Sequence, residues 1–452
     1  MIFWTLDRVA AALGDSAGTR HPHGTSELKG ITTDSRAVAS GQLFVALIGE
    51  KFDGHDFLRD VVEQGAAAVV VSRPISPSEL GVPAFVVPDT LVALGQLANY
   101  YRRAWGGPVV MVAGSNGKTT TKDLIRAALS KAMRVHATTG NLNNRIGVPL
   151  TLLSMAPGVE IAIVEAGTNL PGEVAILRDI MDPDIAVVTS VGEEHLEGLG
   201  DLDGVLREEA AAFEGVRIAI TPASQPEIAA AAHGKAHEVI SVGLDEGDLR
   251  PTSWSISSDG VGTLKLGAVT ITPPLRGIHN LRNAMLAIAV AHSCGVVDEV
   301  AAAGIEAMPV PKMRVAWEQI GRATLINDAY NANPGSSRAA IDVIRGLGGG
   351  RQRVIVLGTM RELGEASARC HDDISRIALE SGADIVAGIG EFAESLGRVA
   401  GGDARVVSSP TVAGIWPLLE PRMKPDAVIL LKASRGVQLE QLVPQITTWA
   451  KT

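Results

Sequence analysis

The sequence predicts an α/β protein of several domains built on parallel sheets. Short apolar segments of strand length alternate with stretches of helical periodicity along much of the chain, which is typical of strand–helix–strand units. A length of 452 residues is enough for two to four domains, and the 49 glycines suit many tight turns between strands and helices. We expect three domains, covering residues 1–107, 108–313 and 314–452.

Composition excludes several classes of protein. A net charge of -10 argues against a general nucleic-acid or anionic-membrane surface, so an anionic substrate needs local positive sites. The two cysteines, Cys294 and Cys370, make no disulfide framework, which fits a reduced cytoplasm. Residues 1–12 lack the pattern of a signal peptide, and no apolar run approaches the roughly 20 residues of a spanning helix. We expect a cytoplasmic monomer without a nucleic-acid partner or membrane span.

The first predicted domain contains short strands and helices. We expect helices at residues 6–13 and 91–101, strand–turn segments at 30–36 and 42–57, and strands at 66–71 and 84–87. The stretch Thr33-Asp34-Ser35-Arg36 has two interpretations. It is either an ordinary polar turn or a group of hydroxyls and a guanidinium that holds a phosphate or a sugar. Trp105-Gly106-Gly107-Pro108 predicts a linker to the next domain.

Residues 109–123, VVMVAGSNGKTTTKD, have the pattern of a phosphate-binding loop. An apolar strand at 109–113 leads into the turn Gly114-Ser115-Asn116-Gly117, and Lys118-Thr119-Thr120 opens a helix. Glycines let backbone N–H groups approach a polyphosphate, and the helix N-terminus adds partial positive charge. Lys118 would then reach the β/γ phosphates and the Thr119 hydroxyl would bind Mg²⁺. The spacing departs from GxxxxGK[ST], because Val112 stands at the first glycine position, and a glycine turn with a surface lysine is the alternative.

Polar side chains follow other predicted strands of the second domain. Glu165 ends an apolar strand at 161–165, and His195 follows a strand at 185–189. In an open α/β sheet the carboxyl ends of the strands form the ligand-binding edge, and a carboxylate there suits a hard cation. A single histidine at such a position is more often structural. Residues 138–149, TTGNLNNRIGVP, have three asparagines in four positions, which also occurs in plain polar turns.

The end of the second domain combines a hairpin and a helix. Residues 254–271 alternate and contain Ser258-Asp259-Gly260, which predicts a hairpin. His279, Asn280 and Asn283 stand at the entry to an alanine-rich helix at 284–291. Helix capping alone could explain Asn280.

The third domain has the pattern of a second α/β sheet of Rossmann-like type. Strand-like segments at 323–326, 354–357, 385–389, 405–407 and 428–431 alternate with helical patterns. It has no GxGxxG, so a dinucleotide is not indicated. Polar loops follow the strands at 328–334, 358–367 and 432–435.

Several of these segments together resemble the Mur ligases. The shared motifs are GSNGKTT at 114–120, ExGxNxxGE at 165–173, HLEG at 195–198, GIHNLRNA at 277–284 and DAYNANPGS at 328–336. ALIGEKFDGHDF, GNLNNRIGVP, RELGEAS followed by His371, and the late KASR resemble the branch that adds D-alanyl-D-alanine to a UDP-N-acetylmuramoyl-tripeptide. The DNPR motif of the meso-diaminopimelate-adding branch is missing. The resemblance covers nearly the whole chain.

The resemblance implies an ATP-dependent, amide-bond-forming ligase of peptidoglycan precursor synthesis. The acceptor carboxylate would attack the γ-phosphate, and an amine would displace phosphate from the acyl phosphate. Residues 1–107 would bind the UDP substrate, 108–313 ATP, and 314–452 the incoming dipeptide. The implied catalytic residues are Lys118, Glu165, His195 and Glu209. Thr119 and Glu165 would bind one Mg²⁺ ion, and His195 would help to bind a second, to which Glu209 also belongs by its position after HLEG. The implied nucleotide contacts are Gly114, Ser115, Asn116, Gly117, Lys118, Thr119, Thr120, His279, Asn280, Asn283, Arg314 and Asp328. The implied substrate contacts are Ser35, Arg36, Asn141, Asn144, Tyr330 and Asn333.

The sequence departs from the family pattern at three positions. Thr359 stands where related sequences carry Asp, and Ala433 replaces a Gly. After HLEG the family usually places a lysine that CO₂ carbamylates into a metal ligand. That position is Glu209 here, and no lysine occurs between residues 132 and 234. We expect Glu209 to supply the carboxylate directly, the alternative being a solvated helix glutamate.

Two other functions stay open at this point. One is a Mur-type ligase with a different amino-acid donor. The other is a P-loop nucleotide switch or regulatory module without ligase chemistry, although the absence of a guanine-specific NKxD weakens a GTPase.

Overall fold

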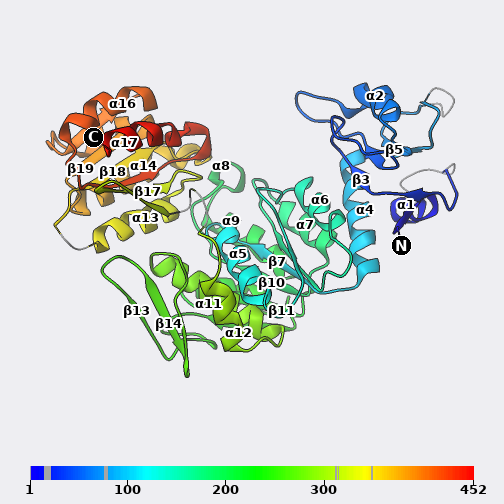
Figure 1. The fold of residues 1–452 in the computed structure, drawn as a ribbon, viewed down its shortest axis with the longest axis horizontal. Helices are drawn as coiled ribbons and strands as arrows, with labels where there is room; N and C mark the ends of the chain where they lie inside the picture. Colours follow the sequence, from blue (N-terminus) through cyan, green and yellow to red (C-terminus); the bar gives the residue numbers. More distant parts are fainter. Residues whose placement is uncertain are drawn as a thin grey trace. The chain divides into compact units, whose positions relative to one another are not determined.

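The computed structural model describes residues 2–14, 22–75, 80–310, 313, 315–347 and 350–451. The chain forms two compact units. The first comprises Met1–Met111, Arg134–Gly167 and Glu173–Asp184, and the second comprises Val112–Met133, Thr168–Gly172 and Ile185–Thr452. Both contain helices and parallel strands (Figure 1), so the predicted α/β class is confirmed. The three-domain boundaries stay a prediction.

The first unit contains a four-stranded parallel sheet in the order β3-β4-β5-β6. These strands are β3 (Ile31–Thr32), β4 (Leu43–Val45), β5 (Ala68–Val71) and β6 (Ala84–Val86). Every residue of β4 and β5 is buried, as expected for parallel strands that are covered on both faces. One apolar cluster joins the sheet to α1 and α4, and a second joins it to α2.

Helices and short strands complete the first unit. The helices are α1 (Leu6–Leu13), η2 (Gly54–Phe57), α2 (Leu58–Glu63), α4 (Thr90–Trp105), α6 (Gly147–Leu153) and α7 (Glu173–Met181). β1 (Trp4–Thr5) and β2 (Glu27–Leu28) pair antiparallel, and β8 (Val135–Ala137) and β9 (Ile161–Glu165) pair parallel. Helix α4 begins one residue before the predicted 91–101, where Asp89 caps its start by accepting from the N–H groups of Leu91 and Val92, and it continues to Trp105.

Strand β7 (Val109–Ala113) passes from the first unit into the second, where α5 (Lys118–Leu129) follows it. The second unit continues with three parallel strands in the order β10-β11-β12, namely β10 (Ile185–Val188), β11 (Ile218–Pro222) and β12 (Glu238–Val242). Between them lie α8 (Leu196–Leu199), α9 (Leu202–Glu209), η3 (Ala210–Phe213) and α10 (Pro226–Ala232).

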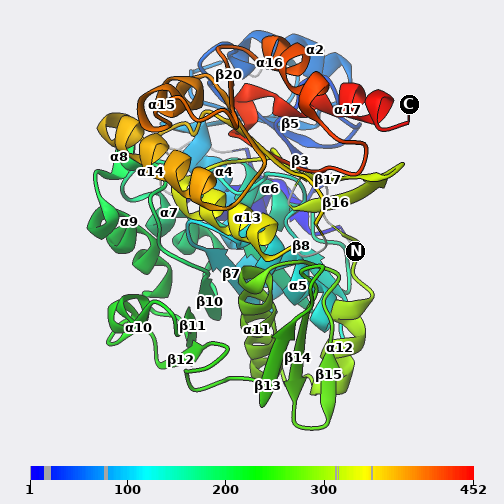
Figure 2. The same cartoon turned by 90° about the vertical axis from the view of Figure 1, so that its left-hand side faces the viewer.

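The predicted hairpin is confirmed as part of a three-stranded antiparallel sheet. Its strands are β13 (Ser253–Ile256), β14 (Gly262–Leu266) and β15 (Val269–Ile271). The buried helix α11 (Ile278–Ser293) follows, and α12 (Asp298–Glu306) comes next. Helix α11 packs against α5, α12 and β14, and Figure 2 shows β13–β15 beside α11.

The C-terminal part of the second unit is a six-stranded sheet in the order β16-β17-β21-β18-β19-β20. The strands are β16 (Ala316–Ile320), β17 (Ala323–Asp328), β18 (Arg353–Gly358), β19 (Ile385–Ile389), β20 (Val406–Ser409) and β21 (Val428–Lys432). Five strands run parallel, as the sequence predicts, and β16 pairs antiparallel with β17 at the edge. The sequence pattern missed β16.

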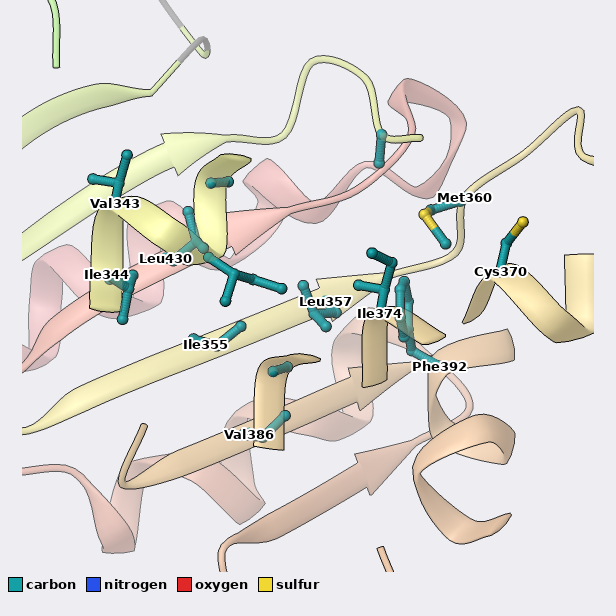
Figure 3. Packing of buried hydrophobic residues seen from close by; sticks show 14 of the residues in the cluster. Val343, Ile344, Ile355, Leu357, Met360, Cys370, Ile374, Val386, Phe392 and Leu430 are labelled. Carbon is teal, nitrogen blue, oxygen red and sulfur yellow. The ribbon is translucent and has the colours of Figure 1, made fainter. Parts of the chain in front are cut away.

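Helices cover both faces of this sheet. They are α13 (Pro334–Gly346), η4 (Gly364–Ala366), α14 (Ser367–Glu380), α15 (Glu391–Val399), α16 (Val412–Leu419), η5 (Glu420–Arg422), η6 (Arg435–Val437), η7 (Leu439–Leu442) and α17 (Val443–Trp449). One apolar cluster, part of which Figure 3 shows, joins α13, α14 and α15 to one face. Leu196 and Leu199 of α8 also belong to this cluster. The other joins α16, η7 and α17 to the opposite face. Among the described residues, no helix is both long and apolar enough to cross a membrane.

Candidate active site

The phosphate loop forms where the sequence predicts it, between β7 and α5. Gly114 and Gly117 have φ angles of +115° and +88°, values that residues other than glycine rarely adopt. A Cβ on Gly114 would lie 2.5 Å from Oγ1 of Thr189, and one on Gly117 would lie 2.9 Å from Oδ1 of Asn283. The backbone path of the loop therefore requires glycine at both positions.

We expect a Gly114→Ala variant to lose ADP affinity and thermal stability. The positive φ costs about 1–3 kcal/mol in a non-glycine residue, and the new Cβ would also meet the Thr189 backbone nitrogen at 2.7 Å. Calorimetric titration with ADP and a thermal melt measure both effects. Gly346→Ala is the matched control, because a Cβ there meets no atom within 4 Å. Wild-type ADP affinity in Gly114→Ala would contradict this account of the loop.

The segment after β10 holds the phosphate loop in place. The Ser115 N–H donates to the Ser190 carbonyl (2.8 Å), and the Asn116 N–H donates to the Ser190 hydroxyl (2.9 Å). The Gly192 N–H donates to the Ser115 hydroxyl (2.9 Å), and the Thr189 hydroxyl donates to the Asn116 carbonyl (2.6 Å). These bonds fix the loop from one side.

The Lys118 side chain folds over the loop that precedes it. Its ammonium donates to the carbonyl oxygens of Gly114 (2.5 Å) and Ser115 (3.2 Å). The helix that starts at Lys118 presents its N-terminal N–H groups at the same place. A positive side chain and a helix N-terminus thus lie together, as a bound polyphosphate requires.

Two adjacent glutamates at the end of α9 point in different directions. Glu209 accepts a hydrogen bond from the Gly114 N–H (2.6 Å), so its carboxylate lies at the phosphate loop. Glu208 accepts instead from the Gly172 N–H (2.6 Å) and the Thr168 hydroxyl (3.2 Å). Both are buried. The interpretation of Glu209 as a solvated helix glutamate is therefore wrong.

Burial raises the pKa of Glu209 to about 7, against the opposing effects of Lys118 and the Gly114 N–H. The negative charges of Glu194 and Glu208 add to the rise. The raised pKa means that the folded protein disfavours the deprotonated, negatively charged form of this carboxyl group. A cation beside it would stabilise that form.

His195 lies between two carboxylates. Its Nε2 is 3.2 Å from Oε1 of Glu194, and its Nδ1 is 2.6 Å from Oε2 of Glu362, in the loop before η4. Burial opposes the charged imidazole, but the two carboxylates outweigh it and raise its pKa to about 9. Burial also favours the neutral form of Glu194, yet Lys118 and His195 hold the pKa of that carboxyl below its usual value. This group joins the segment after β10 to the C-terminal sheet.

His279, Asn280 and Asn283, which the resemblance implies as nucleotide contacts, lie in the first turns of α11. The helix begins after Gly277 without a side-chain cap, and the Asn280 amide donates to the Arg276 carbonyl (2.8 Å). Capping as the explanation of Asn280 is therefore wrong, because the helix starts two residues earlier. Asn283 donates to the Asn280 side chain (3.3 Å) and borders Gly117. Burial lowers the pKa of His279 to about 4.

One further contact ties the C-terminal sheet to the phosphate loop, and an ion pair lies within that sheet. The Asn333 amide donates to the Asn116 side chain (2.9 Å) and its oxygen caps α13. Asp328 pairs with the Lys432 ammonium (2.8 Å), which also donates to the Asn331 carbonyl. Tyr330 is half-buried in the same loop. Arg314 lies outside the described residues.

The departures at Thr359 and Ala433 have structural partners. The Thr359 hydroxyl accepts from the Glu391 N–H (3.1 Å) at the start of α15. Ala433 is buried, and a Cβ on Gly358 would lie 2.9 Å from its side chain. Both residues serve local packing of the C-terminal sheet.

His371 is a structural histidine on α14. Its Nε2 accepts from the Met360 N–H (3.0 Å), and its Nδ1 lies 2.8 Å from the Ser367 carbonyl, so the neutral ring satisfies both contacts. The ring is fully buried, and burial lowers its pKa.

We expect His371 to make the protein less stable in acid. The unfolded chain takes up a proton near pH 6.5, whereas the folded protein resists it, so stability falls as pH drops through that value. A His371→Gln variant should start less stable at pH 7.5 but lose less of its melting temperature between pH 7.5 and 5.5. The exposed His237, changed to Gln, is the control. An unchanged pH response in His371→Gln would contradict the assignment.

The remaining predicted residues lie in the first unit. Glu165 is buried at the end of β9, where its carboxylate accepts from the Asn143 amide (3.1 Å) and its N–H donates to Thr138 (2.9 Å). The Asn144 side chain accepts from the N–H groups of Ile146 and Gly147, where α6 begins.

Two other predicted segments of the first unit are exposed. Asn141 is exposed. Arg36 makes two bonds to Asp34, both 2.9 Å, and these lower the pKa of Asp34 to about 2. Ser35 lies in the same turn. Arg36, like Asn141, is exposed, and Ser35 is half-buried.

The donor set fits a magnesium ion that a nucleotide would bring. Within the described part of the chain, no group of three or more His, Cys, Asp and Glu is arranged to hold a metal alone. Mg²⁺ commonly takes one or two carboxylates together with phosphate oxygens and water. Glu194 supplies the matching observation, because its Oε2 is buried without a hydrogen-bond partner in the described structure. A buried carboxylate oxygen of this kind is suited to an ion or a water.

The motifs did not indicate every residue of this region. Glu194 and Glu362 stand in charged stretches that are typical of solvated loops. Their pairing with His195 becomes evident only in the three-dimensional structure. Asn143 could have been found, because it belongs to the same asparagine cluster as Asn141 and Asn144. Its neighbour Gly167 is close enough that a Cβ there would lie 2.8 Å from its amide.

Three family descriptions match successive parts of the chain. They are the Mur ligase family catalytic domain at residues 27–102, the Mur ligase middle domain at 112–291, and the Mur ligase glutamate ligase domain at 313–435. The UDP-N-acetylmuramoyl-tripeptide–D-alanyl-D-alanine ligase of Bacillus subtilis is 35% identical over 93% of both chains. Its namesake in Escherichia coli is 34% identical over 92% of this chain and 93% of its own.

The fold of this chain is also similar to solved structures of MurF ligases. A crystal structure of MurF from Acinetobacter baumannii has a TM-score of 0.89 and 32% identity, and covers 98% of this chain and 99% of its own. MurF from Thermotoga maritima, in complex with ADP, has a TM-score of 0.83 and 26% identity, over 93% of this chain and 97% of its own.

Proposed function

The chain belongs to the Mur ligase family, and we propose that it joins D-alanyl-D-alanine to UDP-N-acetylmuramoyl-tripeptide with ATP. The observation that carries the proposal is the phosphate loop, with Lys118 folded across it and the Glu209 carboxylate at its first N–H. This arrangement suits transfer of a phosphoryl group. The full-length relatives supply the identity of the two substrates.

The reaction takes two steps. The carboxylate of the acceptor peptide attacks the γ-phosphate of ATP, which gives an acyl phosphate and releases ADP. The amine of the dipeptide then attacks the acyl carbon, and phosphate leaves with its bonding electron pair. Because phosphoryl transfer needs mainly positioning and charge, Lys118 and the loop N–H groups perform most of the first step by holding the phosphates.

A Mg²⁺ ion bound with ATP would neutralise charge on the transferring phosphoryl group. We propose Thr119 and Glu165 as protein ligands of one Mg²⁺ ion, and His195 and Glu209 as ligands of a second. His195 must lose its proton to bind the ion. Its charged form, paired with Glu194 and Glu362, therefore belongs to the protein before the ion binds.

The remaining assignments follow from family membership and are proposals for this chain. The loop residues Gly114 to Thr120 would hold the phosphates, while His279, Asn280, Asn283, Arg314 and Asp328 would serve the rest of the nucleotide. Ser35 and Arg36 would hold the UDP end of the acceptor, and Asn141 and Asn144 its muramyl-peptide part. Tyr330 and Asn333, in the loop and cap between β17 and α13, would contact the substrate. Cys294 and Cys370 are not joined in a disulfide, which fits a cytoplasmic location.

An assay of coupled ADP and phosphate release tests the function. We expect release only when the UDP-muramyl-tripeptide and D-alanyl-D-alanine are both present. Release with a different amino-acid donor in place of the dipeptide would favour a Mur-type ligase of other specificity. ADP binding without release under any combination would favour a nucleotide-binding regulatory module.

A further inference from the structure

The carboxylate of Glu194 has one oxygen that the protein leaves without a partner. Its Oε1 lies 3.2 Å from the His195 ring, whereas Oε2 is buried and has no hydrogen-bond partner among the described residues. The side chain is only 9% exposed. Leaving a buried charged oxygen unsatisfied costs more than an ordinary missing hydrogen bond. The position therefore calls for a group that the protein itself does not supply.

The surroundings of Glu194 point to a cation. The segment that carries it is bonded to the phosphate loop through Ser190 and Gly192. Lys118 and His195 are near enough to favour its charged form. The buried carboxylate of Glu209, at the end of α9, accepts a hydrogen bond from the Gly114 N–H of the same loop (2.6 Å). Two like charges in a buried site are stabilised when a divalent cation lies beside them.

We propose that Glu194 is a direct ligand of the divalent cation that accompanies the nucleotide at the phosphate loop. The bond would run through Oε2, the oxygen without a partner. Oxygen is the ligand that Mg²⁺ prefers, and an ion that keeps several waters needs few protein groups. This role rests on the proposed function only in that ATP brings the ion.

The adjacent residue provides a matched control. Glu193 is also a glutamate, but its carboxylate lies 2.6 Å from the Arg369 guanidinium and is 26% exposed. Replacing Glu193 by Gln removes the same charge one residue away. An effect that follows Glu194 and not Glu193 therefore concerns the oxygen and its ligand, and not the overall charge of the segment.

The test is a titration of Mn²⁺, as a stand-in for Mg²⁺, into the full-length protein saturated with ADP, followed by electron paramagnetic resonance. We expect Glu194→Gln to weaken Mn²⁺ binding about 10-fold or more, given that even outer-sphere partners of a metal are worth about 10–100-fold. Glu193→Gln should bind Mn²⁺ like the wild type. Glu194→Asp keeps the charge and should recover part of the affinity.

Equal Mn²⁺ affinity in wild type and Glu194→Gln would overturn the proposal, since Glu194 would then only neutralise Lys118 or His195. If Glu194→Gln folds poorly by thermal melt, the comparison of Glu194→Asp with the wild type decides, and unchanged affinity there counts against the role. The proposed function is tested separately. If the wild type binds Mn²⁺ but forms no amide, the proposed function is rejected, and the proposed role of Glu194 as a cation ligand stands.

Discussion

A Lys118→Ala variant should fold normally and lose turnover by about 10²-fold or more. The ammonium lies over the loop carbonyls of Gly114 and Ser115, where the nucleotide phosphates would replace those contacts. Transfer of the γ-phosphoryl group spreads negative charge over its oxygens, and a positive group held beside them stabilises that state. Removal of the ammonium should therefore affect the chemical step more than the fold.

Steady-state kinetics and a thermal melt separate these two effects. Lys131→Ala is the control, because Lys131 is exposed just beyond the end of α5. It should keep wild-type turnover. A folded Lys118→Ala enzyme with near-normal turnover would contradict the assignment of the loop as the phosphoryl-transfer site.

A Glu209→Gln variant should lose most of its activity while it keeps its fold. Glutamine has almost the same shape and can still accept the hydrogen bond from the Gly114 N–H. If Glu209 only braced the loop, this change would have little effect. If it binds the cation, the loss of a charged ligand should lower turnover and raise the Mg²⁺ concentration needed for half-maximal rate. Glu208→Gln, whose carboxylate faces Gly172, should leave the Mg²⁺ dependence unchanged.

Carbon dioxide gives a second test of the same residue. A glutamate needs no CO₂ adduct, so wild-type activity should not change when bicarbonate is removed. Glu209→Lys should be poor in CO₂-free buffer and recover partly with added bicarbonate. Wild-type turnover and wild-type Mg²⁺ dependence in Glu209→Gln would refute the role as a cation ligand.

The sequence allowed some of the buried strands to be predicted, although β11, in which all five residues are buried, was missed. β7, β9 and β19 have the predicted bounds, because each is a continuous apolar segment of strand length followed by polar or glycine residues. β16 was missed, since it is an edge strand in which Glu318 and Gln319 are exposed and no continuous apolar run marks it. β12 was missed for a similar reason, because only Val242 is buried in it.

The candidate site was predictable only where a motif marks it. The loop and Lys118 follow from local spacing, whereas the pairing of His195 with Glu362 joins segments far apart in the chain. The sequence pattern does not distinguish the two adjacent glutamates Glu193 and Glu194. The fold directs one side chain to a surface arginine and buries the other beside the loop.

Transfer of oxygen from the acceptor to phosphate tests the central claim most directly. The UDP-muramyl-tripeptide would be labelled with ¹⁸O at both oxygens of the reacting carboxylate and converted with ATP and D-alanyl-D-alanine. Because phosphate leaves with one carboxylate oxygen, the account predicts one ¹⁸O in each phosphate released and one in the new amide, both measured by mass spectrometry. Amide formation with unlabelled phosphate would contradict the acyl-phosphate mechanism.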